Sequence, residues 1–85
     1  MQFARTRIFK KEYEKLEVIV KDVVDKKLTL LLKNPRHPSL RFKKVKGHAG
    51  IWEISITMHY RLLLLIEGDC YTLLRIGTHD SLNKI

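Results

Sequence analysis

Residues 51–76 read IWEISITMHYRLLLLIEGDCYTLLRI. Apolar and polar residues alternate from Ile51 to Met58, which predicts a strand with one buried face. The run from Tyr60 to Ile66 is nearly all apolar and predicts a strand that is covered on both faces. A turn at 67–69, with the sequence EGD, leads to a last strand over 70–76. This stretch therefore predicts three consecutive strands in a meander.

The preceding half of the chain predicts one more strand and a helical zone. Residues 2–9 are rich in aromatic and β-branched types and predict a first strand. Apolar residues over 10–33 recur at spacings of three and four, which predicts amphipathic helix ending at Asn34-Pro35. An unbroken helix of that length would be ~36 Å long, whereas a domain of this size is only ~30 Å across. We therefore expect a break near Glu17 and Val18. The order of elements predicts an α+β class, with helices packed on one face of a sheet.

The length and composition limit the kinds of site that the chain can build. A chain of 85 residues predicts a single domain over 1–85, whose small core leaves little room for a deep catalytic cavity. An open groove, which suits a polymer substrate, is the expected site. The single cysteine excludes an intrachain disulfide, and no metal or nucleotide motif is present, so no metal or cofactor is expected. No apolar run resembles a signal peptide or a membrane span, which predicts a cytoplasmic protein with no membrane partner.

The positive charge is concentrated in one part of the chain. The net charge is +8, and residues 1–50 hold 14 Lys or Arg against 5 acids, whereas 51–85 hold 3 against 4. The segment 33–46, KNPRHPSLRFKKVK, holds six Lys or Arg, one His and no acid. A basic segment that leads into a sheet is typical of a surface that meets a polyanion, most commonly a phosphate backbone. A solvated loop that only aids solubility is the alternative.

Two residues near the strands are candidates for chemistry. Arg61 lies at the start of an apolar strand and needs a partner, because an unpaired buried charge is costly. That partner is either Glu53 on the neighbouring strand or a bound phosphate, and Glu53 itself is either a general base or only a structural partner. His79 follows the last strand, where it either transfers a proton near neutral pH or only bonds its own turn. Three lysines before the strands are candidates to stabilise phosphate charge, or are simply solvated: Lys43, Lys44 and Lys46.

The chain as a whole resembles a known family. Five segments carry the resemblance: FKKEYEKL (9–16), LLLKNPRHPSL (30–40), KKVKGHAGIWEI (43–54), YRLLLLIEGD (60–69) and LLRIGTHD (73–80). In order and spacing they are similar to the RelE/ParE superfamily of toxins from type II toxin–antitoxin modules, in particular its RelE-like branch. The resemblance implies a microbial RNase-type fold, with four antiparallel strands and two helices on one side.

The resemblance also implies an activity and partners. RelE-like toxins cut mRNA in the ribosomal A site, with the 2′-hydroxyl as nucleophile and a 2′,3′-cyclic phosphate as product, and without a metal. The basic loop and the concave sheet face hold the RNA. A cognate antitoxin wraps the toxin and blocks that groove, so the resemblance implies a toxin–antitoxin hetero-oligomer.

Individual residues match the family motifs. Arg61 matches an arginine that contacts the scissile phosphate, and His79 falls where relatives carry a general acid or a charge-stabilising residue. His37 matches a histidine that one subgroup uses, and Lys46 matches a basic position that faces RNA and supports catalysis. Glu53 stands where some relatives carry a catalytic Lys. The residues expected to bind RNA are His37, Arg41, Lys43, Lys44 and Lys46.

The chain also departs from the family pattern near its end. Many members carry a Tyr or Phe in the region where this sequence has Asn83, and no aromatic residue follows Tyr71. The sequence therefore favours a ribosome-dependent endoribonuclease and leaves two alternatives. The first is a toxin of the ParE type that inhibits DNA gyrase. The second is a catalytically inactive module that binds RNA or an antitoxin.

Overall fold

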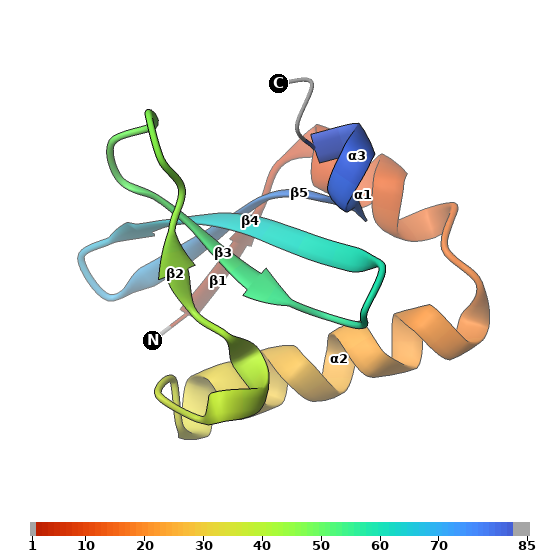
Figure 1. Ribbon diagram of the computed structural model, residues 1–85, viewed down its shortest axis with the longest axis horizontal. Coiled ribbons are helices and arrows are strands. Elements are labelled where there is room, and N and C mark those ends of the chain that lie inside the picture. Colours follow the sequence, from red (N-terminus) through yellow and green to blue (C-terminus); the bar gives the residue numbers. More distant parts are fainter. Residues whose placement is uncertain (1, 83–85) are drawn as a thin grey trace.

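The computed structural model describes residues 2–82, which form one sheet with helices around it (Figure 1). The sheet order is β1-β5-β4-β3-β2. Its strands are β1 (Gln2–Arg5), β2 (Lys43–Lys44), β3 (Ile51–Ser55), β4 (Tyr60–Glu67) and β5 (Cys70–Thr78). The helices are α1 (Arg7–Glu14), α2 (Val18–Lys33) and α3 (His79–Leu82), with a 3-10 turn, η1 (Pro38–Leu40), between α2 and β2.

The predicted α+β class and the three-stranded meander are confirmed, but the sheet is larger than expected. It has five strands, and β1 pairs with β5 in parallel, so the sheet is mixed. The extra strand is β2, whose two lysines pair with Glu53 and Trp52 of β3. A two-residue strand has no period that a sequence pattern can reveal, because it exists only through its pairing.

The first strand is shorter than predicted, because a helix begins inside the expected range 2–9. β1 ends at Arg5, and Thr6 is the N-cap of α1, where its Oγ1 accepts a hydrogen bond of 3.0 Å from the backbone N–H of Phe9. Phe9 then turns into the core with only 1% of its surface exposed. Threonine favours both strands and N-caps, so the sequence pattern missed this boundary.

The predicted break in the helical zone is confirmed. α1 ends at Glu14 and α2 begins at Val18, which allows both helices to pack on a domain with a longest extent of 30 Å. α2 lies along one face of the sheet, as Figure 1 shows. The buried residues of α2 join strand residues of that face in the core: Val24, Leu28, Leu31, Ile54, Leu62, Leu64, Leu73 and Ile76. Among residues 2–82, no helix is long and apolar enough to cross a membrane.

An irregularity in β5 keeps that core continuous. Leu64 pairs with Leu73, whereas Leu63 pairs with Arg75, so one extra residue of β5 lies between the two pairs. Without it, side chains three residues apart would point to opposite faces of the sheet. The shift allows both Leu73 and Ile76 to be buried on the α2 face.

The strand predicted over 51–58 ends early. β3 stops at Ser55, and the chain turns back over residues 56–59 to reach β4. Ile56 keeps its predicted buried position, but Met58 lies in the turn with 83% of its surface exposed. The apolar alternation continues through the turn, which explains why the sequence did not mark the strand end.

Candidate active site

Two charged residues lie diagonally across β3 and β4, on the face opposite α2. Ser55 pairs with Arg61 and Glu53 pairs with Leu63, while Ile54 between them is buried on the α2 face. Side chains alternate along strands, so Glu53 and Arg61 share the other face of the sheet. The expected neighbour relationship between these two residues is therefore present.

The carboxylate of Glu53 lies between two cations. Its Oε2 is 3.6 Å from Nζ of Lys43 and 3.9 Å from Nε of Arg61. The Glu53 and Arg61 side chains are 17% and 18% exposed, whereas Lys43 is 65% exposed. The cluster therefore has a mostly buried carboxylate and guanidinium, with one exposed cation at its side.

The guanidinium of Arg61 is also fixed by the turn that precedes β4. Its Nη1 donates to the carbonyl oxygens of Thr57, Met58 and Tyr60, at 2.6, 3.2 and 3.0 Å. The predicted pairing with Glu53 is therefore present, and the turn orients the same side chain, while contact with a phosphate stays a prediction. Among residues 2–82, no hydrogen bond uses Nη2, so this nitrogen keeps two N–H groups for a ligand.

His79 lies at the end of β5, close in register to Arg61. Gly77 pairs with Arg61 and Thr78 pairs with Tyr60, and the backbone N–H of His79 donates to His59 at 3.2 Å. The exposed His79 lines an open hollow of about 560 Å³ beside the start of β4. Within residues 2–82, no hydrogen bond or ion pair connects its imidazole to Glu53 or Arg61.

Gly77 allows α3 to approach the sheet at this point. A Cβ on Gly77 would lie 2.7 Å from Oγ of Ser81 and 3.6 Å from the side chain of Leu82. Leu82 is buried. α3, which begins at His79, therefore lies directly against the strand that faces Arg61. Asn83, which stands where many family members carry an aromatic residue, lies outside the described residues.

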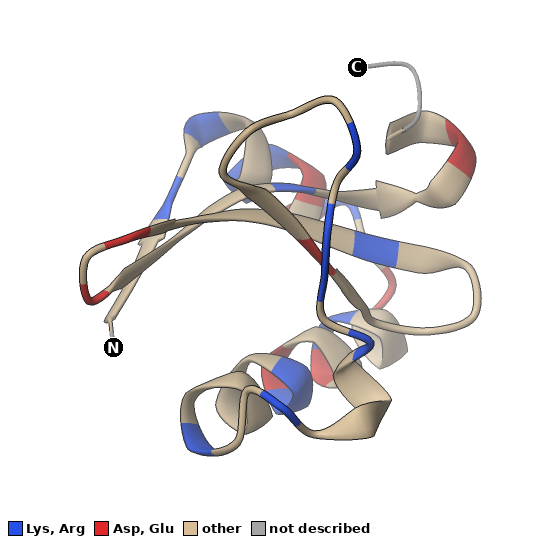
Figure 2. Cartoon of the chain, turned by 60° about the vertical axis from the view of Figure 1, so that its left-hand side comes forward, with Lys and Arg blue, Asp and Glu red and all other residues tan. Residues whose placement is uncertain are grey.

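The segment 33–46 is more ordered than the predicted loop. Leu40 in η1 is fully buried, and His37 caps η1 by accepting a hydrogen bond of 3.1 Å from the backbone N–H of Ser39. Figure 2 shows blue stretches, which mark Lys and Arg, along the segment where it passes in front of the sheet. Its two neighbouring lysines diverge. Lys43 faces Glu53, whereas Nζ of Lys44 lies 5.5 Å from the ring centroid of Trp52.

The predicted RNA-binding residues therefore do not share one face. Lys43 alone contacts the Glu53–Arg61 pair. Arg41 and His37 line a separate cavity under the segment, and Lys46 is exposed in the turn before β3. The basic segment is expected to hold RNA together with the sheet face, and its lysines would then face the same groove as Arg61. Lys43 does face Glu53 and Arg61, but Lys44 does not, because adjacent strand residues point to opposite faces.

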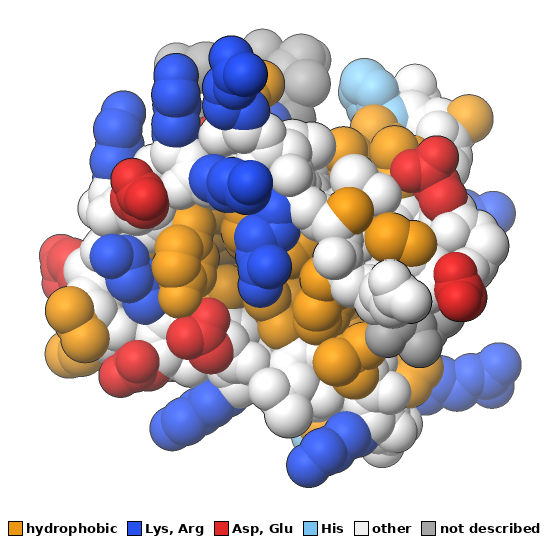
Figure 3. All heavy atoms as spheres, turned by 180° about the vertical axis from the view of Figure 1, so that it is seen from behind, with side chains coloured by type: hydrophobic (Ala, Val, Ile, Leu, Met, Phe, Trp, Pro, Cys, Tyr) orange, Lys and Arg blue, Asp and Glu red, His pale blue; other side chains and the backbone are white. Residues whose placement is uncertain are grey.

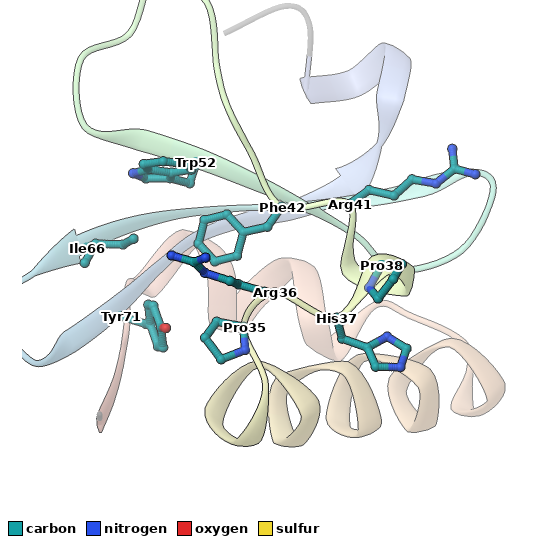
Figure 4. Close-up of a pocket in the computed structure, with 9 residues that line it drawn as sticks. All are labelled: Pro35, Arg36, His37, Pro38, Arg41, Phe42, Trp52, Ile66 and Tyr71. Atoms are coloured by element: carbon teal, nitrogen blue, oxygen red, sulfur yellow. The ribbon is translucent and has the colours of Figure 1, made fainter.

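Sequence reasoning missed that cavity, which has a volume of about 570 Å³ (Figure 4). Its aromatic walls are Phe42, Trp52 and Tyr71. The rings of Phe42 and Trp52 meet edge to face, with centroids 5.0 Å apart. Burial raises the pKa of Tyr71 above its usual value. The sequence signal that could have revealed it is the pair of aromatic residues on either side of the lysines, at 42 and 52.

The opposite side of the molecule carries an apolar surface. Figure 3 shows hydrophobic side chains gathered there, with Lys and Arg as well as Asp and Glu side chains around them. A hollow of about 430 Å³ among β1, α1 and α2 is lined by residues that include Phe3, Leu28 and Leu32. At its side, Tyr13 donates a hydrogen bond of 2.9 Å to Asp25. Burial and this bond raise the pKa of Tyr13. Within residues 2–82, no group of three or more His, Cys, Asp or Glu side chains is placed to hold a metal ion.

Comparison with known proteins places this architecture among toxins. Residues 25–84 match the model of the ParE-like toxin domain. No curated protein sequence is significantly similar to the chain. Three similar solved structures are a YoeB/ParE toxin from Agrobacterium tumefaciens, YafQ from E. coli, and a chain of the intact E. coli RelBE toxin–antitoxin complex.

The structural similarity extends over nearly the whole chain. The Agrobacterium toxin is 18% identical with a TM-score of 0.80, over 93% of this chain and 99% of that one. YafQ is 16% identical with a TM-score of 0.80, over 94% of this chain and 94% of that one. The RelBE chain is 23% identical with a TM-score of 0.71, over 89% of this chain and 93% of that one. The family match over residues 25–84 shows that the chain belongs to the ParE-like toxin domain family, and the solved structures share its fold.

Proposed function

We propose that this toxin is a ribosome-dependent endoribonuclease that cleaves mRNA. The observation that carries the proposal is the cluster of Lys43, Glu53 and Arg61 on the open sheet face, with His79 at the neighbouring strand end. The cluster combines cations for a phosphate with a carboxylate and an imidazole for proton transfer. The open face suits a long polymer better than a buried metabolite.

The proposed reaction assigns one role to each of these residues. The 2′-oxygen attacks the adjacent phosphorus while the Glu53 carboxylate takes its proton. Arg61, through the free edge of its guanidinium, and Lys43 stabilise the added negative charge on the pentacoordinate phosphorus. The bond to the 5′-oxygen then breaks, and the imidazolium of His79 donates a proton to that leaving oxygen. The products are a 2′,3′-cyclic phosphate and a free 5′-hydroxyl.

The remaining basic residues have a binding role in this proposal. Lys46 in the exposed turn compensates phosphate charge. Lys44 lies on β2 beside Lys43, but on the other face of the sheet, over Trp52. Arg41 and His37 extend the positive surface along the segment before β2. Because such contacts release counterions, RNA affinity should fall steeply as salt increases.

A cognate antitoxin is the proposed protein partner. RelE in the similar E. coli structure was crystallised in a toxin–antitoxin complex. On this chain, which carries a net charge of +8, the hollow among β1, α1 and α2 is partly lined by apolar side chains, and Val18 and Ile19 on α2 are 71% and 75% exposed. An acidic antitoxin with an apolar helix face would complement this surface.

Inhibition of DNA gyrase is the second candidate, because the matching family model is the ParE-like toxin domain. A gyrase inhibitor needs the same fold but no acid–base pair. In that case Glu53 and His79 would serve only as the partner of Arg61 and the first residue of α3.

One set of assays separates these functions. Purified toxin is added to ribosomes translating a defined mRNA, cleavage is mapped by primer extension, and plasmid supercoiling by gyrase is measured in parallel. We expect cleavage in the wild type, its loss in Glu53→Gln and His79→Gln, and unchanged cleavage in Lys26→Ala, an exposed control on α2. Gyrase inhibition without cleavage would support the second candidate. RNA binding with neither activity would identify an inactive binding module.

A further inference from the structure

The aromatic cavity lies on the opposite side of the sheet edge from the proposed active site. It opens between residues 35–42 and the sheet face that α2 covers, where Trp52 and Ile66 continue the buried rows of β3 and β4. Its volume of about 570 Å³ is within the range of small-ligand sites, about 300–1,000 Å³. Its lining comes from the segment 35–42 and three strand residues, Trp52, Ile66 and Tyr71.

The charge around the cavity selects the kind of ligand. Arg36, His37 and Arg41 contribute to its lining, and none of its lining residues is acidic. In Figure 4 the side chain of Arg36 extends over the cavity toward the aromatic rings, whereas that of Arg41 is directed away. The cavity thus offers an apolar aromatic wall with a guanidinium at its mouth. A flat aromatic group that carries an anion is complementary to both.

The edge strand β2 connects this cavity to the proposed active site. Lys43 contacts Glu53 on one face of the sheet, and Lys44 lies over Trp52 on the other. β2 is the edge strand of the sheet, so a chain that crosses this edge passes from one face of the sheet to the other. A single-stranded nucleic acid that passes over β2 would meet a cation on each side.

We propose that the cavity binds one unstacked nucleotide of the RNA whose neighbouring part lies at Arg61. The base lies against Trp52 and Phe42, and Arg36 holds its phosphate with a paired hydrogen bond. Stacking tolerates any base, so the cavity adds RNA affinity without strong sequence preference. The choice of RNA as the polymer rests on the proposed endoribonuclease function, while the binding of a base and a phosphate rests on the cavity alone.

The single tryptophan allows a direct test. Trp52 is the only tryptophan in the chain, so its fluorescence reports on the cavity. The probe is a 2′-O-methyl tetrauridylate, which lacks the nucleophile and is not cleaved. We expect saturable quenching of Trp52, and about tenfold weaker binding in Arg36→Ala because a charged hydrogen-bond partner is lost. Lys10→Ala removes the same charge from the exposed surface of α1 and should leave the affinity unchanged.

A second ligand separates base from phosphate. An abasic tetranucleotide keeps every phosphate but has no base, and we expect it to bind more weakly and not to quench Trp52. Equal binding of the abasic probe, or equal losses in Arg36→Ala and Lys10→Ala, would mean that only general charge attraction is measured and would overturn the proposal. Quenching by an acidic peptide but not by the tetrauridylate would overturn it in favour of a protein-docking site.

The outcome is also distinct from that of the cleavage assay. Glu53→Gln should abolish cleavage and leave quenching by the tetrauridylate unchanged. A wild type that shows no cleavage but binds the tetrauridylate through Arg36 contradicts the endoribonuclease proposal and supports the nucleotide cavity. Cleavage that depends on Glu53, without quenching of Trp52 by the tetrauridylate, supports the endoribonuclease proposal and contradicts the nucleotide cavity.

Discussion

Arg61 and Glu53 are joined across β3 and β4, with Nε of the arginine 3.9 Å from Oε2 of the glutamate. The same guanidinium donates through Nη1 to three carbonyl oxygens of the turn before β4. One residue therefore supports the turn and presents a charged edge to the open face of the sheet. Loss of Arg61 would change both stability and phosphate binding, so a single alanine variant cannot separate the two roles.

Two substitutions of Arg61 separate these effects. Arg61→Ala should lower the free energy of unfolding by about 2 kcal/mol, because charged hydrogen bonds to the turn are lost, and should abolish cleavage. Arg61→Lys keeps a charge and three donors but not the planar fork, so it should recover much of the stability and little of the cleavage. Urea unfolding and primer extension measure the two quantities. A lysine variant with full cleavage would show that only the charge matters.

Glu12 connects α1 to the part of β5 that continues beyond its pairing with β1. Its carboxylate accepts hydrogen bonds from Nε and Nη2 of Arg75, the shortest of them 2.7 Å, and from the backbone N–H of Ile76 at 3.1 Å. The bond to Glu12 raises the pKa of Arg75. Glu12→Ala should lower the free energy of unfolding in urea by about 1–3 kcal/mol. Glu14→Ala, an exposed change on the same helix, should have almost no effect, and equal losses would contradict this role.

The contact between Gly77 and α3 predicts a coupled pair of substitutions. Gly77→Ala places a methyl group 2.7 Å from Oγ of Ser81, so Ser81 or α3 must move. We expect a loss of about 1–3 kcal/mol in the free energy of unfolding and reduced cleavage, because α3 carries His79. Ser81→Ala removes the clashing atom, and the double variant should recover most of the loss. Strictly additive effects in this cycle would argue against the contact.

Burial of Tyr71 predicts a loss of stability at alkaline pH. Its pKa is raised in the folded protein, so its contribution is fully present below the usual value of about 10 and is lost as pH rises through the higher folded value. Tyr71→Phe removes this contribution, so its stability should fall less than that of the wild type between about pH 8 and about pH 11. Urea unfolding at both values gives the comparison. An unchanged pH dependence would show that the Tyr71 hydroxyl is not desolvated.

Much of the fold could be read from local patterns. The alternation around Ile54 and the apolar run that begins at Tyr60 identified the meander, and the length limit identified the helix break before Val18. The fold class followed from the order of these elements. The boundaries at Thr6 and Met58 were missed, because each residue fits two local structures and only its tertiary contacts select one.

The candidate site was only partly predictable. Arg61 and Glu53 could be paired, because a charge in an apolar strand needs a partner on the next strand. The opposite directions of Lys43 and Lys44 could not, because a two-residue strand has no period until it pairs with β3. The aromatic cavity was missed for a similar reason, because Tyr71 and Trp52 line one cavity only once their strands are paired in the sheet.

The sequence by itself determined the α+β class, the basic surface and the identity of the charged pair, because period, composition and local charge are properties of neighbouring residues. Only the tertiary structure decided that β1 runs parallel to β5 and that β2 closes the edge of the sheet. It also decided that the basic segment divides between the Arg61 face and an aromatic cavity. These features depend on contacts between residues far apart in the chain, and such contacts exist only once the core has formed.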